Sequence, residues 1–368
     1  MKPYMIYSTL RKAAIGIMAA VGIGSFAVQT QAASKLSSGK WVKIRVETTG
    51  IHQITDAQLK EMGFADPSKV AVYGNPAVLM ANYKLTADLT DDVVAIPSKN
   101  VDGKLLFYAL GDMYLKPVRG YNPTYTYKNE HVSVLRNFYA DYGTYFLTDS
   151  QPAAEVKQIA APEAPAETDI NSGYGLVCYE DEVSNPDSFG PRYFSPGLTK
   201  GETGVYNFKM PQFREGNETD GYTKLPMLFL IASKNTSSAQ QSIQLPGNAS
   251  GSIYISKHSE SYHHYYGQSS IFNANTSAAP VKATADDTYS VKINTTINGT
   301  LWLDYFTALY PQWNRMGDRN CAEFAYTNIQ KTNTISFEAD EAKDWIVWDI
   351  TDPMEVKEMA YIRYAETP

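Results

Sequence analysis

The stretch LWLDYFTALYPQWNRMGDRNCAEFAY, residues 301–326, is the part of the chain from which the fold is most readily predicted. Side chains of a strand alternate between two faces, so residues 301, 303, 305, 307 and 309 are expected on one face and residues 302, 304, 306, 308 and 310 on the other. Both faces are largely apolar, which indicates a strand in the middle of a sheet. Residues 314–318, including Gly317, are predicted to turn the chain into a second strand over residues 321–326.

The N-terminus has the features of an export signal. Lys2, Arg11 and Lys12 form a basic start, residues 13–28 are apolar, and Ala32 ends a suitable cleavage site. Residues 1–32 are therefore predicted to be a cleaved signal peptide, with a retained membrane anchor as the alternative. No later segment has transmembrane length, because the apolar run at residues 225–232 is short and fits a buried strand.

Composition favours a mainly β protein and argues against two classes of partner. The chain contains 27 tyrosines, a residue type enriched in strands. Its formal charge of −7 becomes −10 when the three cations of residues 1–32 are removed. An acidic chain with no basic run is not expected to bind nucleic acid or an anionic membrane.

Residues 33–150 are predicted to form a small β-rich module of the α+β type. Residues 39–47 alternate like a strand, and residues 48–50 are expected to turn it into a hairpin with residues 51–54. Thr55 and Gln58 have the spacing of a capping box, which predicts a short helix that Gly63 ends. Further strands are expected at residues 70–73, 105–109 and 139–148, with a tight turn at residues 101–104.

The rest of the chain is predicted to contain a linker, a second module and a connector. Residues 151–168 are rich in Ala, Pro and Glu, which is typical of a linker or exposed loop. Residues 169–340 show short strand patterns separated by turn residues, which favours an antiparallel β-sandwich. Residues 341–368 form the connector, in which one indole of Trp345 and Trp348 is expected to pack on the sandwich and the other to stay partly exposed.

Seven segments carry a resemblance to a known family, in unbroken order. They are GKWVKIRVETTGIHQIT (39–55), DPSKVAVYG (66–74), GKLLFYALGD (103–112), YGTYFLT (142–148), CYEDEVSNPDSFGPRYFSPG (178–197), LWLDYFTALYPQWNRMG (301–317) and VWDITDP (347–353). Together they resemble the N-terminal, non-catalytic region of the type IX secretion system sortases, which are gingipain-type cysteine peptidases. The resemblance covers residues 39–353, nearly all of the expected mature chain.

The resemblance implies a role without catalysis for this chain. In the family, a caspase-like domain with a His–Cys pair follows the connector, so we expect no catalytic, cofactor-binding or metal-ligating residue here. The family's enzymes remove C-terminal secretion signals from cargo and join the cargo to a lipopolysaccharide anchor. This chain would cover or orient the peptidase domain and dock other secretion components, in the periplasm or at the outer-membrane surface of a Gram-negative bacterium.

Two other classes of function remain open. The first alternative is a self-standing cell-surface β-sandwich that binds a glycan or a protein. The second alternative is a stand-alone hydrolase, which ranks below the sortase region and below the binder. An in-frame continuation past codon 368, or a neighbouring peptidase gene, would favour the sortase region, whereas a clean stop would favour the binder.

Cysteine chemistry offers little support for a hydrolase. Cys178 and Cys321 are the two cysteines of the chain, and neither lies in a glycine-rich turn that would expose its sulfur. They are expected to be a disulfide or two separately buried thiols. The histidines that could act as bases are His52, His131, His258, His263 and His264.

A polar and aromatic cluster at residues 258–266 is the main candidate for ligand contact. Its histidines and Glu260 could ligate a metal, and its tyrosines could stack on a sugar or a partner. In a strand His258, Glu260 and His264 share a face while His263 points away, so ordinary surface structure is favoured over a metal site. The acidic runs at residues 91–92, 180–182 and 286–287 also alternate across a strand, which argues against paired catalytic carboxylates.

Overall fold

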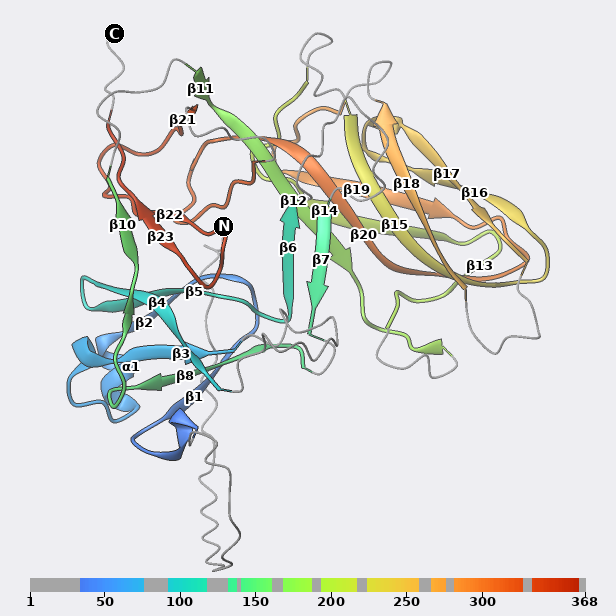
Figure 1. Ribbon diagram of the computed structural model, residues 1–368. Coiled ribbons are helices and arrows are strands. Elements are labelled where there is room, and N and C mark those ends of the chain that lie inside the picture. The colour runs from blue at the N-terminus through green and yellow to red at the C-terminus, as the bar shows by residue number, and fades with distance from the viewer. Residues whose placement is uncertain are drawn as a thin grey trace, which may run out of the picture. The chain divides into compact units, whose positions relative to one another are not determined.

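The structure, a computed structural model, describes residues 34–75, 92–117, 132–137, 140–160, 168–186, 193–216, 224–257, 266–275, 281–326 and 333–363 (Figure 1). These residues are mainly in strands, with α1 (Asp56–Glu61) as the one α-helix among them. The prediction of a mainly β fold is confirmed. Within the described part, no helix is long and apolar enough to span a bilayer.

The chain divides into two compact units, and each is composed of separate segments. The first contains residues 1–114, 135–162 and 343–368, and the second contains residues 115–134 and 163–342. This division differs from the predicted one, because the expected connector belongs to the first unit. A pair of strands, β6 (Met113–Pro117) and β7 (Val132–Arg136), is shared between the units.

The first unit is built on a single sheet. Its order is β1 (Val42–Val46), β8 (Gly143–Thr148), β3 (Ala71–Gly74), β4 (Val94–Val101), β5 (Lys104–Ala109) and β2 (Gly50–Thr55), with β9 (Ala154–Glu155) parallel to β4. The predicted hairpin of residues 39–54 is wrong, because β1 pairs with β8 and β2 pairs with β5. Alternation shows which face of a strand is buried, but not which strand lies beside it.

Local signals in the first unit are confirmed. The Thr55 side chain accepts from the Gln58 backbone, Gln58 caps the Thr55 backbone in return, and α1 buries Leu59 completely. Gly63 ends the helix with φ +86°, a left-handed conformation that glycine adopts without strain. The turn between β4 and β5 has Asp102 and Gly103 at φ 49° and 71°, as the predicted two-residue hairpin requires.

Tyr145 shows how the first unit fills its core. Its ring is 1 % exposed, and its hydroxyl accepts from the Leu110 backbone at 2.6 Å and donates to the Leu110 carbonyl at 3.2 Å. The two hydrogen bonds satisfy the hydroxyl and so offset the cost of burying a polar group. A side chain at Gly143 would lie 2.0 Å from the same carbonyl, so glycine is required there.

The second unit is an antiparallel sandwich of two sheets, as predicted (Figure 1). One sheet has the order β12 (Ser172–Glu180), β20 (Gly299–Trp313), β15 (Lys224–Asn235) and β18 (Tyr266–Asn275), with β13 (Leu198–Thr199) also beside β20. The other has the order β14 (Thr203–Lys209), β19 (Thr288–Asn294), β16 (Ala239–Gln244) and β17 (Ser250–Ile255).

Strand β20 contains a bulge that the sequence pattern did not predict. Leu230 lies opposite Tyr305 and Ile231 lies opposite Leu303, so Asp304 is an extra residue in the ladder. An extra residue exchanges the two faces of a strand, and the predicted alternation across residues 301–310 is therefore wrong. The β20 side chains in the sandwich core are Leu301, Leu303, Phe306, Ala308 and Tyr310.

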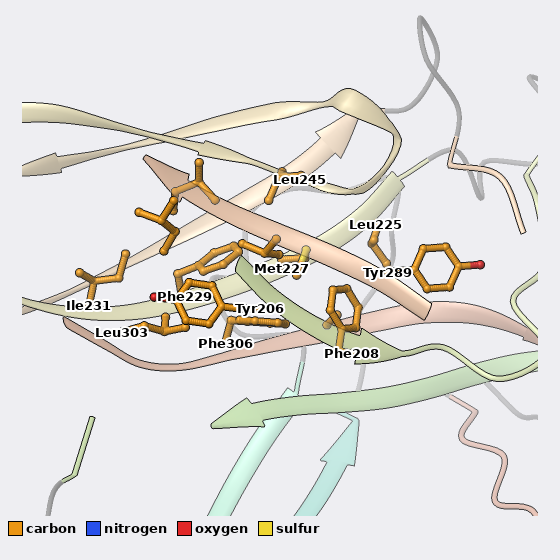
Figure 2. Packing of buried hydrophobic residues seen from close by; sticks show 14 of the residues in the cluster. Tyr206, Phe208, Leu225, Met227, Phe229, Ile231, Leu245, Tyr289, Leu303 and Phe306 are labelled. Atoms are coloured by element: carbon orange, nitrogen blue, oxygen red, sulfur yellow. The ribbon is translucent and has the colours of Figure 1, made fainter. Parts of the chain in front are cut away.

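Phe306 is at the centre of the sandwich core (Figure 2). It is fully buried, and its ring centroid lies 5.2 Å from those of Tyr179 and Phe208 and 5.3 Å from that of Phe229. The opposite face of β20 is also covered, because Trp302 packs with Phe194 and Leu309 with Val132. The prediction of a strand buried on both faces is confirmed.

Two predicted segments differ in the structure. Residues 151–168 are not a linker throughout, because they include β9 and β10 (Lys157–Ile159), and β11 (Thr168–Ile170) begins at their end. Residues 321–326 are not a strand, and only Ala325 forms an isolated bridge, with Tyr174. In the first segment, the strands have distant partners, because β10 runs parallel to β23 (Lys357–Met359) and β11 to β21 (Asn333–Ile335). In the second, the bridge of Ala325 likewise goes to a distant residue, Tyr174.

Candidate functional site

Asn314 organises the end of β20. It is 2 % exposed, and its amide donates to the carbonyls of Ile170 at 3.0 Å and Ser336 at 2.9 Å. Its side-chain oxygen accepts from the Tyr326 hydroxyl at 3.1 Å. One side chain therefore joins the ends of β11 and β21 to the loop that follows β20, and we call this cluster the β20 junction.

Arginines surround the β20 junction and lie on aromatic rings. The guanidinium carbons of Arg214 and Arg315 are 4.8 and 5.1 Å from the ring of Trp313. Arg214 also donates to Ser172 at 3.1 Å, and Arg315 forms an ion pair with Glu338 at 2.8 Å. These contacts hold the planar guanidinium groups in defined orientations.

Arg319 anchors the loop after β20 instead of reaching toward solvent. Its guanidinium donates to the carbonyls of Met316, at 3.0 Å, and Arg315. Burial lowers the pKa of this guanidinium, because a charged group is less stable away from water. Burial likewise raises the pKa of the Tyr310 hydroxyl, an effect that the nearby Arg319 opposes.

The β20 junction presents guanidinium groups that are held in defined orientations. Guanidinium groups stacked on a ring can bind a carboxylate or phosphate, as Arg315 already binds Glu338. In the loop after β20, burial raises the pKa of the Cys321 thiol, an effect that Glu323 reinforces and Arg319 opposes, and burial raises the pKa of the Glu323 carboxyl to about 7. The junction was not predicted from the sequence, although Asn314 and its neighbours Trp313 and Arg315 lie in the resembling segment at residues 301–317.

The segment predicted to be a connector is part of the first unit. Strand β22 (Val347–Asp349) pairs with β23, and Val356 is buried with Tyr108, Leu110 and Tyr114. Trp348 packs against the same cluster, so this indole packs within the first unit and is not the one expected on the sandwich. Trp345 is also half-buried, with the Lys343 ammonium 5.6 Å from its ring.

A half-buried ion pair fastens this C-terminal segment. The Lys99 ammonium donates to both oxygens of the Glu358 carboxylate at 2.6 Å. The two side chains are 29 % and 18 % exposed, so water screens the pair less than it screens a surface pair. This pair could not be predicted from the sequence, because 258 residues lie between its members along the chain.

The cysteines and histidines form no catalytic pair in the described residues. Cys178, opposite Thr307 in the β12–β20 ladder, and Cys321 are not joined by a disulfide. His52 is buried in the first unit, where its Nε2 donates to the Thr48 carbonyl at 2.9 Å and its ring stacks on Phe107. The other four histidines, His131, His258, His263 and His264, lie outside the described residues.

The remaining predicted candidates have structural roles or lie outside the described residues. Of the cluster at residues 258–266, only the backbone of Tyr266 is described, at the start of β18. Asp92 accepts from the Lys35 and Val93 amides and from Ser34, and the Lys35 contact lowers its pKa most. Asp286 likewise caps Thr288, which lowers its pKa. Among the described residues, no group of three or more His, Cys, Asp or Glu could hold a metal ion.

Comparison with known proteins finds a solved structure with a matching fold. No family model and no curated protein matches the sequence. The two units define a mainly β protein whose larger unit is an antiparallel sandwich. Dimeric latent PorU from Porphyromonas gingivalis has this fold, with a TM-score of 0.67 and 22 % identity over 90 % of this chain. The match spans 30 % of the PorU chain, so this chain corresponds to less than a third of that protein.

Two further solved structures are much less similar to this chain. BuGH86 in complex with neoagarooctaose matches with a TM-score of 0.24 and 8 % identity, over 74 % of this chain and 33 % of that chain. The Gx strain of infectious bursal disease virus matches with a TM-score of 0.25 and 11 % identity, over 76 % of this chain and 73 % of that chain. These scores support no argument about fold or function. The chain has a PorU-like fold.

Proposed function

We propose that this chain is the accessory, non-catalytic N-terminal region of a type IX secretion sortase. The observation that carries the proposal is the PorU-like fold of 90 % of the chain, at a TM-score of 0.67. The order of the seven resembling segments supports the same assignment. In this role the chain covers and orients a peptidase domain and docks other secretion components.

The location of the chain belongs to the same proposal. Residues 1–32 direct export and are cleaved, and the mature protein works in the periplasm or at the outer-membrane surface of a Gram-negative bacterium. The β20 junction supports a docking role, because its oriented arginines are suited to the carboxylates of a partner protein. The catalytic His and Cys are supplied by the peptidase domain.

The test follows the native protein in the cell envelope of the bacterium that encodes it. Antibodies against the second unit should recover, from crosslinked outer membranes, a peptidase with a catalytic His–Cys pair, as part of the same polypeptide or bound to it. Deleting the coding region should leave cargo with uncleaved C-terminal signals, seen as a mass increase. Normal cargo processing and no recovered peptidase would contradict the proposal and favour a self-standing binder.

A second function, a cell-surface β-sandwich that binds glycan, is favoured by one surface of the second unit. The outward side of the sheet containing β14 and β17 is polar, almost uncharged and carries an exposed tyrosine. The two functions are compatible, since a sortase region can also contact glycan. They are distinguished by whether loss of the chain alters cargo processing.

A further inference from the structure

The outward side of the β14–β19–β16–β17 sheet has an unusual composition. Alternate side chains point away from the core at four positions on β14, four on β19, three on β16 and three on β17. Amides or hydroxyls occupy all of these positions except Val205, Lys209, Lys292 and Tyr254. None is acidic, in a chain with 39 Asp and Glu residues. We call this surface the polar face.

Tyr254 gives the polar face an exposed aromatic ring. It is 58 % exposed and lies opposite Gln240 in the ladder between β17 and β16. The Gln240 amide donates to the Ser252 hydroxyl at 2.6 Å, which orients it beside the tyrosine. Ser252 in turn lies opposite Ser242. Amide and hydroxyl groups that can both donate and accept therefore border one side of the ring.

The polar face extends across all four strands. Val205 lies opposite Lys292, Lys292 opposite Gln244, and Gln244 opposite Ser250. Neighbouring strands are about 4.8 Å apart, so hydrogen-bonding groups recur at that interval across the sheet. Such a spacing suits a ligand whose hydroxyl groups repeat along an extended chain.

Other classes of ligand fit the polar face less well. A stable protein interface has an apolar centre, whereas Val205 and Tyr254 lie on β14 and β17, the two edge strands of this sheet. Nucleic acid requires a basic surface, but the face carries only two lysines, and Lys209 lies 3.6 Å from the Asp286 carboxylate. A metal ion requires acidic or imidazole ligands, which the face does not contain.

We propose that the polar face binds a neutral oligosaccharide. One pyranose ring stacks on Tyr254, since the apolar face of a sugar ring matches an exposed aromatic side chain. Its hydroxyls bond to Gln240, Ser242 and Ser252, directly or through water. Further sugar units follow the row formed by Gln244 and Lys292. The proposal does not depend on the sortase assignment, because it rests on the surface of this unit alone.

The experiment is native affinity electrophoresis of the full chain in gels containing soluble neutral polysaccharides. Mannan, laminarin, galactomannan and xyloglucan serve as probes, and at least one is expected to retard the protein. Tyr254→Ala should weaken that retardation about tenfold, the effect of losing one well-placed ring contact. Gln240→Ala should weaken it about threefold, because one hydrogen bond to a neutral group is lost.

Tyr193→Ala is the matched control, because Tyr193 is a tyrosine of the same unit that is 43 % exposed and lies outside the polar face. It should leave retardation unchanged. All three variants replace exposed or half-exposed side chains outside the core, and near-ultraviolet circular dichroism checks their folding. Equal loss in Tyr193→Ala and Tyr254→Ala would overturn the proposal, and so would the absence of retardation by all four polysaccharides.

Salt separates a neutral ligand from an anionic one. Binding through stacking and neutral hydrogen bonds should be unchanged when salt is raised from low to physiological concentration and above. Dextran sulfate serves as the anionic probe. Retardation by dextran sulfate alone, abolished by salt and by Lys292→Ala, would overturn the neutral-oligosaccharide proposal.

Discussion

Asn314 shows how much one buried amide determines at the residue scale. Its side chain makes three hydrogen bonds to three separate segments of the second unit. Asn314→Ala leaves two carbonyls and a hydroxyl without this partner, so it should lower the free energy of unfolding by about 3 kcal/mol. Urea unfolding measures the change. Asn294→Ala, an exposed amide on the polar face, is the control and should change stability by less than about 0.5 kcal/mol.

His52 makes a prediction about pH. Burial lowers its pKa below the ordinary value of 6.5, although its hydrogen bond to Thr48 opposes the shift. Below pH 6.5 the unfolded chain therefore binds a proton that the folded chain resists, and stability falls as the pH falls. His52→Gln keeps a donor without titrating, so its unfolding free energy should decline less between about pH 6.5 and 5. Parallel pH profiles for the two proteins would contradict this role.

At the element scale, the bulge in β20 determines which side chains reach the core. Deleting Asp304 would place either Leu301 and Leu303 or Phe306, Ala308 and Tyr310 on the wrong face. We expect the deletion to abolish cooperative unfolding of the second unit, measured by tryptophan fluorescence in urea. Asp304→Asn keeps the residue count and should remain folded. A cooperative, near-native transition for the deletion would show that the bulge is dispensable.

The C-terminal strands belong to the first unit because distant residues hold them there. Removing the charge of Glu358 leaves the half-buried Lys99 ammonium without its carboxylate. Glu358→Gln should therefore lower stability by about 1–2 kcal/mol, between the values for surface and buried pairs. Chemical denaturation at two salt concentrations measures it. Glu355→Gln is the matched control, because Glu355 is an exposed glutamate close to Glu358 in the chain. An equal loss of stability in the two variants would contradict the role of the pair.

At the scale of the whole molecule, a single cut should not separate the chain into two independent parts. A protease site placed between β10 and β11 would yield two fragments, and both contribute strands to the first unit. Residues 343–368 would remain paired to β10 and packed on the Tyr108 cluster. The nicked protein should therefore show two bands in a denaturing gel and one unchanged peak in size exclusion. Separate elution of the fragments would refute this connectivity.

Local features of the fold were predictable because nearby residues determine them. The capping box at Thr55, the left-handed Gly63 and the Asp102–Gly103 turn need only neighbours in sequence. The hairpin of residues 39–54, the linker at residues 151–168 and the strand at residues 321–326 were predicted wrongly for the opposite reason. Each depends on a backbone partner far along the chain, and alternation alone does not identify that partner.

The candidate surfaces, like the fold, were predictable from the sequence only in part. The sequence drew attention to the stretch that contains Trp313, Asn314 and Arg315, yet not to Arg214 or Glu338, which reach them from other segments. The sequence did not draw attention to residues 239–255, where the ladder between β17 and β16 brings Tyr254 opposite Gln240. The histidine cluster at residues 258–266 stays a prediction, since only the Tyr266 backbone is described.

The sequence by itself determined the mainly β class, the sandwich, the local turns and the resemblance to a sortase region. The class, the sandwich and the turns follow from side-chain periodicity and from residues close together in the chain, whereas the resemblance rests on seven segments that match in order. Only the tertiary structure decided the strand order, the Asp304 bulge, the junction around Asn314 and the return of residues 343–363 to the first unit. The physical reason is that apolar burial specifies a face, whereas strand pairing and buried hydrogen bonds specify a partner, and those partners lie tens to hundreds of residues away.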